Sequence, residues 1–367
     1  MSCIIWLTDD YLPDQGGMAL SCERIVTQLR QCDICIHVVH FTNDHPPFEI
    51  EQQHNGTYMA CPVDKDEAHS LNVAWKVLEN RMRHEKFSHL VAFGGLRPML
   101  AGPVFADWMD IPLITMIRGL EFEMYVFSSD KRKVLDHAFH RSRTVCAVSK
   151  EKAYKIAKLY KDVTVAYTPS GIDLKGWDLT DENRIRAKAI RAQSDKRTIG
   201  IFGKFKARKG VSFFIKAICE SHVHDQVRLL IAGDLTEKSE KKLEKYGVEY
   251  ELFPYMEREK LLDIYPACDA VAIPSFYDGM PNVLLEAGAL GVPIIGSRVD
   301  GMKDLIDDGE NGFLFAPGSL DGCTHTLEAF LNTPTENLQE MGDRLKKLIR
   351  ASYTIEKECE CFLNIFG

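Results

Sequence analysis

Residues 274–297 read PSFYDGMPNVLLEAGALGVPIIGS and contain most of the signals that decide the fold. The stretch predicts the end of a buried strand, a turn of small residues, an apolar helix that ends at Leu290 and a second buried strand. A helix between two short apolar strands is typical of a parallel sheet that is covered by helices. The sequence therefore predicts a parallel α/β domain with two acids, Asp278 and Glu286, near one helix terminus.

The same alternation of strand and helix signals runs through the whole chain. Apolar strand patterns in the first half are CIIWLTDDY, CIHVVHF, SHLVAFGG, IPLITMIRG and RTVCAVS, and the pattern restarts with KRTIGIFGKF, QVRLLIAGD and AVAIPS. A charge-rich segment from Asp178 to Arg197 separates the halves as a helix or linker. A chain of 367 residues with 45% hydrophobic content is too long for one ordinary core. We therefore predict two Rossmann-like, doubly wound α/β domains, residues 1–170 and 171–349, which face each other across a central cleft.

The composition argues against several classes of protein. The formal net charge of −8 argues against general nucleic-acid binding. The longest apolar runs are far shorter than a membrane span, and the N-terminal segment lacks the basic start of a signal peptide, so we expect a cytoplasmic protein. The eleven cysteines show no metal-type spacing, and the C-x-x-C pair, Cys32 and Cys35, joins a helix end to a strand start. We expect these cysteines to be reduced and structural.

A basic loop follows the strand pattern TIGIF. Residues 203–210, GKFKARKG, place four cations between Gly203 and Gly210, and an apolar helix follows. Glycines allow a ligand to approach the backbone, and each charge-assisted contact to a phosphate contributes about 1.5–3 kcal/mol. The loop therefore favours a polyphosphate ligand, with an exposed and solvated basic loop as the alternative. It is not a Walker A loop, because the G-x-x-x-x-G-K-[ST] order is absent.

The start of the apolar helix is a second candidate anion site. Pro281 suits the first turn of a helix, which leaves the backbone N–H groups of Met280, Asn282 and Val283 without partners at the positive end of the helix dipole. Glu286 lies one turn further along, where burial is costly without a hydrogen-bond partner. The vicinal hydroxyls of a ribose would supply that partner. Together these features predict a nucleotide whose diphosphate caps the helix.

Several motifs of the second half, taken together, resemble a known enzyme family. They are FGKFKARKG, IAGD, LLDIYPACDAVAIPSFYDGMPNVLLEAGALGVPIIGS and VDGMKDLIDDGENGFLFAPG. These motifs resemble the nucleotide-binding half of the family 4 glycosyltransferases, which have the GT-B fold, and the resemblance is strong from Thr198 to Pro317. In the first half, YLPDQGGMALSCERIVTQL and TPSGID are more loosely similar to the family's first glycine-rich loop and interdomain signature. The resemblance implies a retaining, nucleotide-sugar-dependent transferase with a C-terminal helix, about residues 350–367, that packs on the first domain.

The resemblance implies a role for each matching residue. Lys204 and Lys209 would bind the donor diphosphate and stabilise the charge on the leaving phosphate. Glu286 would hold the nucleotide ribose, and Asp278 would contact hydroxyls of the donor sugar near its C3. The glycines of the first loop would let its backbone approach the diphosphate and the acceptor. The implied donor-binding set is Gly16, Gly17, Gly203, Met280, Asn282, Val283, Leu284 and Glu286.

Three positions depart from the family pattern. The first acid is Asp278 instead of glutamate, and the first basic residue is Lys204 instead of arginine, which loses bidentate geometry. Both changes keep the charge but bear on the choice of donor. Where many members have a histidine that approaches the donor sugar, this chain has Arg118, which we expect to replace that histidine. Glu121 and Asp14 are further candidate contacts to the sugar or the acceptor.

This interpretation requires no cofactor and no metal ion. No carboxylate stands out as a covalent nucleophile, so we expect a front-face displacement in which the leaving phosphate helps to take the acceptor proton. The acids of the TDD motif, Thr8 to Asp10, are typical of strand ends, where aspartates cap backbone groups or bind hydroxyls, with metal ligation as a weaker alternative. Two other functions stay open from the sequence: a catalytically silent sugar-nucleotide-binding protein, and a GT-B epimerase or phosphorylase.

A basic segment extends from Lys131 to Lys161 in this acidic chain. It holds ten Lys and Arg residues against Asp136 and Glu151. It indicates either two solvated helix faces or a surface for an anionic acceptor or an anionic membrane. The base, the sugar and the acceptor stay open, because the loops that would select them, Asp44 to Asn55 and Val63 to Asn72, show no regular pattern.

Overall fold

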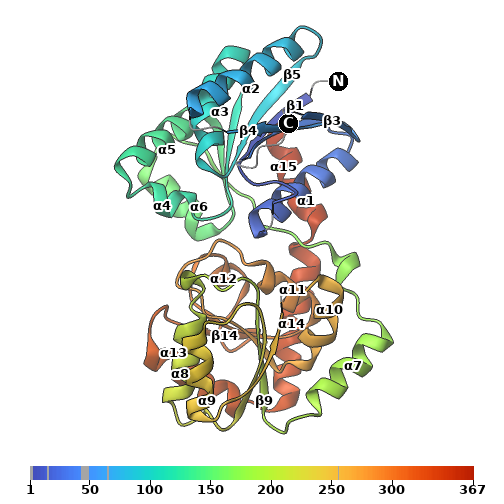
Figure 1. Cartoon of the computed structure of the whole chain (residues 1–367), viewed down its shortest axis with the longest axis vertical. Coiled ribbons are helices and arrows are strands. Elements are labelled where there is room, and N and C mark those ends of the chain that lie inside the picture. The colour runs from blue at the N-terminus through green and yellow to red at the C-terminus, as the bar shows by residue number, and fades with distance from the viewer. Residues whose placement is uncertain (1–2, 15, 43–48, 64–65, 255) are drawn as a thin grey trace. The chain divides into compact units, whose positions relative to one another are not determined.

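The computed structural model describes residues 3–14, 16–42, 49–63, 66–254 and 256–367. The chain forms two compact units (Figure 1): unit 1 comprises the residues up to Ser170 together with Ile355–Gly367, and unit 2 comprises Gly171–Thr354. Each unit is built on one mainly parallel sheet with helices packed on it. The α/β class predicted from the strand and helix signals is confirmed.

Unit 1 is built on an eight-stranded sheet with the strand order β3-β4-β2-β1-β5-β6-β7-β8. All neighbouring strands pair parallel except β3 and β4, which pair antiparallel. Every residue of β1 and β2 is buried, as expected for strands that are covered on both faces. The strands are β1 (Cys3–Thr8), β2 (Ile36–Thr42), β3 (Glu49–Gln53), β4 (Gly56–Pro62), β5 (Phe87–Phe93), β6 (Leu113–Ile117), β7 (Ser142–Ala147) and β8 (Val165–Tyr167).

Helices cover both faces of this sheet. On one face, α1 and α15 pack against each other, and Cys359 and Phe362 of α15 join the core around Trp6. On the other face, Leu78 of α2 and Phe105 of α3 pack in the core over Ile5 and Leu7 of β1. Unit 1 therefore takes part of its core from the last helix of the chain. Its helices are α1 (Gly17–Gln31), α2 (Glu67–Met82), α3 (Leu96–Met109), α4 (Glu121–Tyr125), α5 (Ser129–Arg141), α6 (Lys150–Leu159) and α15 (Ile355–Phe366).

Two regions that the sequence analysis treats as irregular loops contain regular structure. The first begins outside the described residues, but Glu49–Gln53 forms β3 and pairs with β4. Asn55 lies in the two-residue turn between Gln53 and Gly56 and has a φ of 49°, a left-handed backbone that asparagine tolerates, and Gly56 begins β4 with a φ of 139°. The second region, from Val63 to Asn72, contains the start of α2, which Asp66 caps. The loop prediction was wrong for these residues because it gave no weight to the Asn-Gly turn signal and the helix cap.

The cysteines are not all reduced, contrary to the expectation from sequence. Cys3, the first residue of β1, forms a disulfide with Cys35, which directly precedes β2. β1 and β2 are neighbouring parallel strands that begin at the same edge of the sheet. The topology therefore joins two cysteines that are 32 residues apart, a pairing that local spacing does not signal. Cys32 lies at the C-cap of α1, as predicted.

Unit 2 is built on a six-stranded sheet with the order β11-β10-β9-β12-β13-β14, and all neighbouring strands pair parallel. This is the strand order of doubly wound nucleotide-binding folds. The order reverses between β9 and β12, so the connections leave these two strands in opposite directions. The strands are β9 (Arg197–Phe202), β10 (Val227–Ala232), β11 (Glu249–Phe253), β12 (Ala270–Ile273), β13 (Ile294–Ser297) and β14 (Gly312–Phe315).

The charge-rich segment between the predicted halves forms helix α7 (Asp181–Arg191), which belongs to unit 2. Phe214 of α8 and Leu327 of α13 pack in one core with β9 and β10. The other helices are α8 (Val211–Glu220), α9 (Glu237–Tyr246), α10 (Arg258–Ile264), α11 (Asn282–Leu290), α12 (Asp300–Leu305), α13 (Leu320–Asn332) and α14 (Thr335–Ser352), with short 3₁₀ turns η1 (Leu174–Trp177), η2 (Ala207–Lys209) and η3 (Tyr265–Ala267).

Candidate functional site

The candidate site of unit 2 lies where the strand order reverses. In open α/β sheets, ligands bind outside the carboxyl ends of the strands at this point. The basic loop, residues 203–210, follows β9, and the segment that leads to α11 follows β12. β9 and β12 are hydrogen-bonded neighbours, so both segments emerge side by side. The fold therefore places the two stretches singled out from the sequence at one position.

The basic loop is fixed by close backbone packing on the end of β12. Gly210 has a φ of 69°, and a Cβ atom at this position would lie 2.0 Å from the carbonyl oxygen of Pro274. Only glycine fits such an approach. The backbone N–H of Phe276 donates to the carbonyl oxygen of Arg208 at 2.8 Å. These contacts hold the loop against the strand end and set the position of Lys209.

Lys209 and Asp278 form an ion pair at the centre of the site. The Asp278 side chain is 12% exposed and the Lys209 side chain 28% exposed. The Asp278 carboxylate also accepts hydrogen bonds from the Ser275 hydroxyl at 3.2 Å and from the Gly279 backbone N–H at 3.1 Å. Lys204 is exposed in the same loop. Of the two lysines predicted to bind a diphosphate, Lys209 is thus the one that lies against the acid.

Helix α11 begins beside the Lys209–Asp278 pair, at Asn282, one residue later than predicted. Pro281 is the N-cap of the helix and not part of its first turn, because its ψ of 131° is extended. The backbone N–H of Leu284 donates to the carbonyl oxygen of Pro281 at 3.0 Å. No side chain of the described residues caps this helix. The N–H of Leu284 is thus already engaged within the helix, and those of Asn282 and Val283 are donors of its first turn as predicted. The role of Met280, which precedes the N-cap, stays a prediction.

Glu286 lies one turn into α11 and has a partner that the sequence analysis missed. The phenol of Tyr265 donates to its carboxylate at 2.6 Å. Burial raises the pKa of the Glu286 carboxyl, against the opposing effects of Tyr265 and Arg258. Burial and the nearby Glu286 also raise the pKa of Tyr265. Leu284 and Leu285 are buried against the sheet, as the helical pattern predicts. Tyr265 follows α10, and the apolar residues around it gave no signal of its partner.

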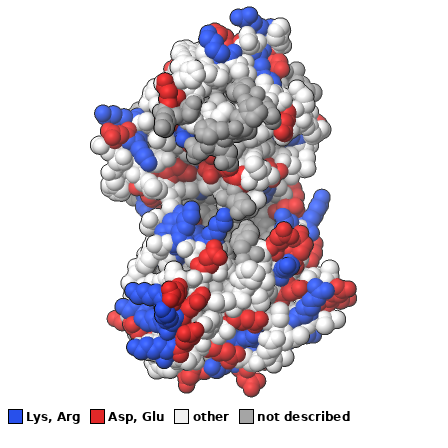
Figure 2. All heavy atoms as spheres, viewed as in Figure 1, with Lys and Arg blue, Asp and Glu red and all other residues white. Residues whose placement is uncertain are grey.

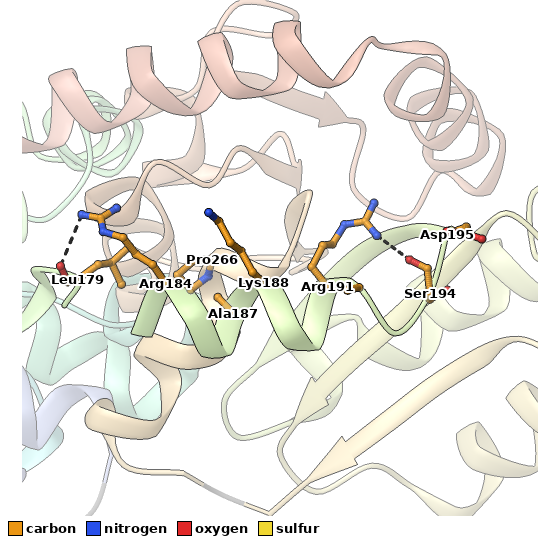
Figure 3. A pocket seen from close by; sticks show the side chains of 9 residues that line it. Leu179, Arg184, Ala187, Lys188, Arg191, Ser194, Asp195 and Pro266 are labelled. Carbon is orange, nitrogen blue, oxygen red and sulfur yellow. Dashed lines mark hydrogen bonds between the residues drawn. The ribbon is translucent and has the colours of Figure 1, made fainter. Parts of the chain in front are cut away.

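A separate hollow of unit 2, with a volume of about 590 Å³, lies along α7 (Figure 3). Arg184, Lys188 and Arg191 follow one another along the helix and point to the same side. Arg228, near the start of β10, donates to the carbonyl oxygen of Ile190 at 2.8 Å, which places this end of α7 at the amino edge of the sheet. The hollow is therefore distinct from the candidate site, and none of the predicted site residues lines it.

In unit 1, the loop after β1 leads into α1. Gly16 is the N-cap of α1 with a φ of 147°, and Gly17 is the first helical residue, whereas residue 15 lies outside the described chain. A Cβ atom on Gly16 would meet no atom within 4 Å. The Asp14 carboxylate lies 3.2 Å from Nε2 of His40, which is buried in β2. The glycines predicted from the sequence thus lie at the start of α1, at the carboxyl edge of this sheet. The Asp14 carboxylate contacts His40.

Arg118 is not placed to contact a sugar, contrary to the expectation from the family pattern. Its side chain is 1% exposed. It donates to the carbonyl oxygen of Thr168 at 2.6 Å and to the Ser170 hydroxyl at 2.8 Å, and it pairs with Glu358 of α15. The guanidinium is therefore used to hold the last helix of unit 1. A single sequence gives no sign of this partner, which lies 240 residues further along the chain.

Glu121 remains a candidate at the carboxyl edge of unit 1. It is buried, and its carboxylate accepts the Gly119 backbone N–H at 2.9 Å. A Cβ atom on Gly94, which follows β5, would lie 3.1 Å from Oε1 of Glu121. Burial raises the pKa of this carboxyl. The acid thus lies where the loops after β5 and β6 meet.

Asp9, from the TDD motif, is held by Arg97. Its carboxylate accepts the Arg97 backbone N–H at 3.2 Å and pairs with the guanidinium at 3.4 Å. A Cβ atom on Gly95 would lie 2.3 Å from the carboxylate, so a glycine is required there. Burial raises the pKa of Asp9 from 3.8 to about 6, against the opposing effect of Arg97. The contacts describe a strand-end acid bound to a helix start.

We expect Asp9→Asn to change the pH dependence of stability. The folded chain binds more protons at Asp9 than the unfolded chain between pH 3.8 and about pH 6. The contribution of Asp9 to the free energy of unfolding therefore falls as the pH rises through this window. Urea unfolding at pH 5 and at pH 7.5 should show the variant gaining on the wild type at the higher pH. A difference that is the same at both values would contradict the raised pKa.

The basic segment from Lys131 to Lys161 forms α5, β7 and α6, and much of its charge is paired. Lys152 is fully buried against Glu123. On the face shown in Figure 2, Lys and Arg of unit 1 lie scattered and next to Asp and Glu. Phe127, just before α5, is 91% exposed, and an exposed aromatic side chain is compatible with contact to a membrane surface. Binding of this segment to an anionic membrane stays a prediction. Further pairs among the described residues include Arg132 with Asp136, Arg141 with Asp107, and Lys155 with Glu151.

Within the described ranges, no helix is both long enough and apolar enough to cross a bilayer.

Comparison with known proteins extends the likeness to the whole chain. Residues 182–348 match the family described as "Glycosyl transferases group 1". The N-acetyl-alpha-D-glucosaminyl L-malate synthase of Bacillus anthracis is 22% identical over 368 residues, which cover 96% of this chain and 94% of that protein. The matched family region contains the basic loop, Asp278 and all of α11.

Solved structures share the fold of the complete chain. Sucrose-phosphate synthase from Thermosynechococcus elongatus matches with a TM-score of 0.83 at 16% identity, over 100% of this chain and 98% of that one. Anabaena HepE, solved in complex with UDP-glucose, matches with a TM-score of 0.78 at 16% identity, over 100% of this chain and 99% of that one. At these identities the likeness concerns the fold. Residues 182–348 are thus similar to the glycosyl transferases of group 1, and the chain has the GT-B fold of its structural neighbours.

Proposed function

We propose that the chain transfers a sugar from a nucleoside-diphosphate sugar to a hydroxyl acceptor with retention of configuration. The observation that carries this proposal is the meeting of Lys209, Asp278 and the amino end of α11 at the strand-order reversal of unit 2. Groups that bind a diphosphate lie there beside an acid that can bind sugar hydroxyls. The complex of the structural neighbour HepE with UDP-glucose supports a donor of this class.

The diphosphate of the donor binds to Lys209 and to the amino end of α11. Lys209 exchanges the Asp278 carboxylate for phosphate oxygens, and the backbone N–H groups of Asn282 and Val283 donate to the same group. Fixed cations and helix-terminal dipoles stabilise the charge that develops on the leaving phosphate. Asp278, released from Lys209, accepts hydrogen bonds from hydroxyls of the donor sugar.

Glu286 holds the ribose of the nucleotide. A carboxylate offers about four lone-pair positions, so Tyr265 leaves acceptor capacity for two vicinal hydroxyls. Tyr265 also fixes the rotamer of Glu286 before the donor binds. The burial that raises the pKa of this carboxyl is offset when ribose hydroxyls add hydrogen bonds to its charged form.

Transfer proceeds on the face of the sugar from which the phosphate leaves. The bond between the anomeric carbon and the phosphate oxygen breaks, the acceptor oxygen bonds to the same carbon, and the acceptor proton passes to the leaving phosphate. In this arrangement Asp278 binds sugar hydroxyls and Glu286 binds Tyr265 and the ribose, which favours this route over a covalent intermediate on either acid. An α-linked donor should give an α-linked product by NMR, and a β-linked product would overturn this assignment.

A donor screen tests the proposal. UDP-, GDP-, ADP- and CMP-sugars are compared by thermal shift, because a donor at a hundred times its Kd adds about 2.7 kcal/mol of stability. Each donor that binds is then assayed for nucleotide release. We expect one base to be selected, and Glu286→Ala to weaken binding of that donor by at least about tenfold, since one charged hydrogen-bonding group contributes about 1.5–3 kcal/mol.

The matched control is Glu259→Ala on α10, an exposed acid outside the site, which should bind the donor as the wild type does. Donor binding without release of nucleotide, under any acceptor mixture, would favour a silent sugar-nucleotide-binding protein. Equal loss of binding in both variants would show that Glu286 acts only through stability.

A further inference from the structure

Unit 1 brings four metal-ligating side chains together at the amino edge of its sheet, the edge opposite to its glycine loop. Cys3 opens β1, Cys35 directly precedes β2, His37 is the second residue of β2, and Glu85 lies just before β5. β2, β1 and β5 are consecutive neighbours in the sheet, so their amino ends lie side by side. We propose that Cys3, Cys35, His37 and Glu85 form a structural site for a zinc ion when the two cysteines are reduced.

The geometry fits a tetrahedral ion. The ligand atoms of Cys3, Cys35 and His37 all lie within 4.8 Å of one another. Sγ of Cys35 lies 3.6 Å from Nε2 of His37. A zinc ion with Zn–S near 2.3 Å and Zn–N near 2.0 Å separates its ligand atoms by about 3.3–3.8 Å. The Cys35 sulfur and the His37 nitrogen therefore already have the spacing of two ligands of one ion, whereas the two sulfur atoms, which are bonded to each other in the disulfide, must move apart to about 3.8 Å after reduction.

Glu85 completes the set as the fourth ligand. Its Oε2 is buried, lies 2.8 Å from Nε2 of His37 and yet makes no well-directed hydrogen bond. The Glu85 side chain is 37% exposed, so it can open this distance by about the half ångström that a shared ion requires. Two thiolates, an imidazole and a carboxylate are a donor set that suits zinc among the common divalent ions.

The surroundings prepare His37 and balance the charge. The Thr57 hydroxyl lies 2.9 Å from Nδ1 of His37, and in the metal-bound form this nitrogen donates to it, which leaves Nε2 for the ion. In the metal-free structure the Arg81 guanidinium lies 3.0 Å from Nδ1 of His37 and 3.8 Å from the Glu85 carboxylate. In the metal-bound form it would move from His37 to the Glu85 carboxylate. Two thiolates and a carboxylate, with Arg81 and a divalent ion, sum to zero charge.

The disulfide and the ion exclude each other, because both use the same two sulfur atoms. Two molecules of a small thiol, such as glutathione, reduce the disulfide to two cysteine thiols. The two reductant molecules leave joined to each other as one disulfide, such as oxidised glutathione. Binding of the divalent ion then releases the two thiol protons to solvent. The starts of β1 and β2 are thus linked in either state. The disulfide links them under oxidising conditions, and the ion links them under reducing conditions.

Cobalt(II) serves as the spectroscopic probe. The full chain is reduced with a phosphine, stripped with a chelator and titrated with cobalt. We expect one ion per chain, with a thiolate-to-cobalt charge-transfer band in the near ultraviolet and the visible bands of a tetrahedral ion. Zinc should displace the cobalt and bleach both, because it binds such sites more tightly. Protein oxidised with glutathione disulfide should show no band.

Variants separate this site from adventitious binding. Cys35→Ser should remove the charge-transfer band, and Glu85→Gln, a change in the segment between α2 and β5, should weaken cobalt binding by at least about tenfold. Cys32→Ser is the matched control, since this exposed cysteine is the C-x-x-C partner of Cys35 and lies outside the set. The proposal is overturned if reduced protein gives no band, if Cys35→Ser keeps it, or if Cys32→Ser loses it equally.

Discussion

Lys209→Ala is expected to lower the rate of sugar transfer by about 100- to 1000-fold, the usual cost of removing one fixed group that meets charge in a transition state. Lys209 is the cation of the basic loop that forms an ion pair with Asp278. Steady-state kinetics with the donor selected by the screen would measure the loss, which should appear in kcat as well as in kcat/KM because the charge develops on the leaving phosphate.

Two further variants test whether the loss is specific to the position of Lys209. Lys216→Ala on the exposed face of α8 removes a similar charge nearby and should leave kcat within about twofold. Asp278→Asn removes the internal competitor for Lys209, so it should tighten binding of the free nucleoside diphosphate while it slows sugar transfer. If Lys209→Ala keeps more than a third of the wild-type kcat, Lys209 has no role at the leaving group.

Glu358→Ala is expected to destabilise unit 1 by about 3–5 kcal/mol, because it leaves a buried guanidinium without its counter-charge. The side chains of Glu358 and Arg118 are 2% and 1% exposed. Glu358 also accepts hydrogen bonds from Arg24 of α1. Burial lowers the pKa of Arg118 and Glu358 opposes this effect, so the loss of the carboxylate leaves the cost of burial uncompensated. Urea unfolding followed by circular dichroism would measure the change.

Glu356→Ala is the matched control on the same helix. Glu356 is exposed, so its loss should change the free energy of unfolding by no more than about 0.5 kcal/mol. Because multi-domain proteins commonly unfold in more than one step, we expect the transition of unit 1 to move while that of unit 2 stays in place. A loss below about 1 kcal/mol for Glu358→Ala would mean that water or another acid compensates Arg118.

The unit 2 site was predictable because its signals are local. The basic loop and the segment before α11 each lie within a short stretch, and strand-helix alternation alone places both at the carboxyl edge of a parallel sheet. The predicted start of α11 was wrong by one residue, since proline fits both the N-cap and the first turn. Tyr265 was missed, because a tyrosine among apolar residues looks the same whether its hydroxyl meets a carboxylate or water.

Unit 1 was harder to predict because its decisive contacts are distant in sequence. Arg118 follows a strand, as a catalytic residue often does, and its local sequence agrees with that interpretation. Its partner Glu358 comes from the last helix, where it has the same helical pattern as any other acid. The Cys3–Cys35 pair was hidden for the same reason, since two strands must first be placed side by side before their first residues can meet.

The return of the chain to unit 1 has a consequence for its biosynthesis. Unit 2 is one continuous segment, Gly171–Thr354, whereas unit 1 lacks α15 until Ile355 and the residues after it are made. At roughly 5–20 residues per second, a ribosome takes about 10–40 s to pass from the end of one part of unit 1 to the start of the other. During that delay Arg118 has no counter-charge and the α1 face lacks Phe362. The unit that begins translation first is therefore completed last, and a nascent chain exposes this face to chaperones throughout the synthesis of unit 2.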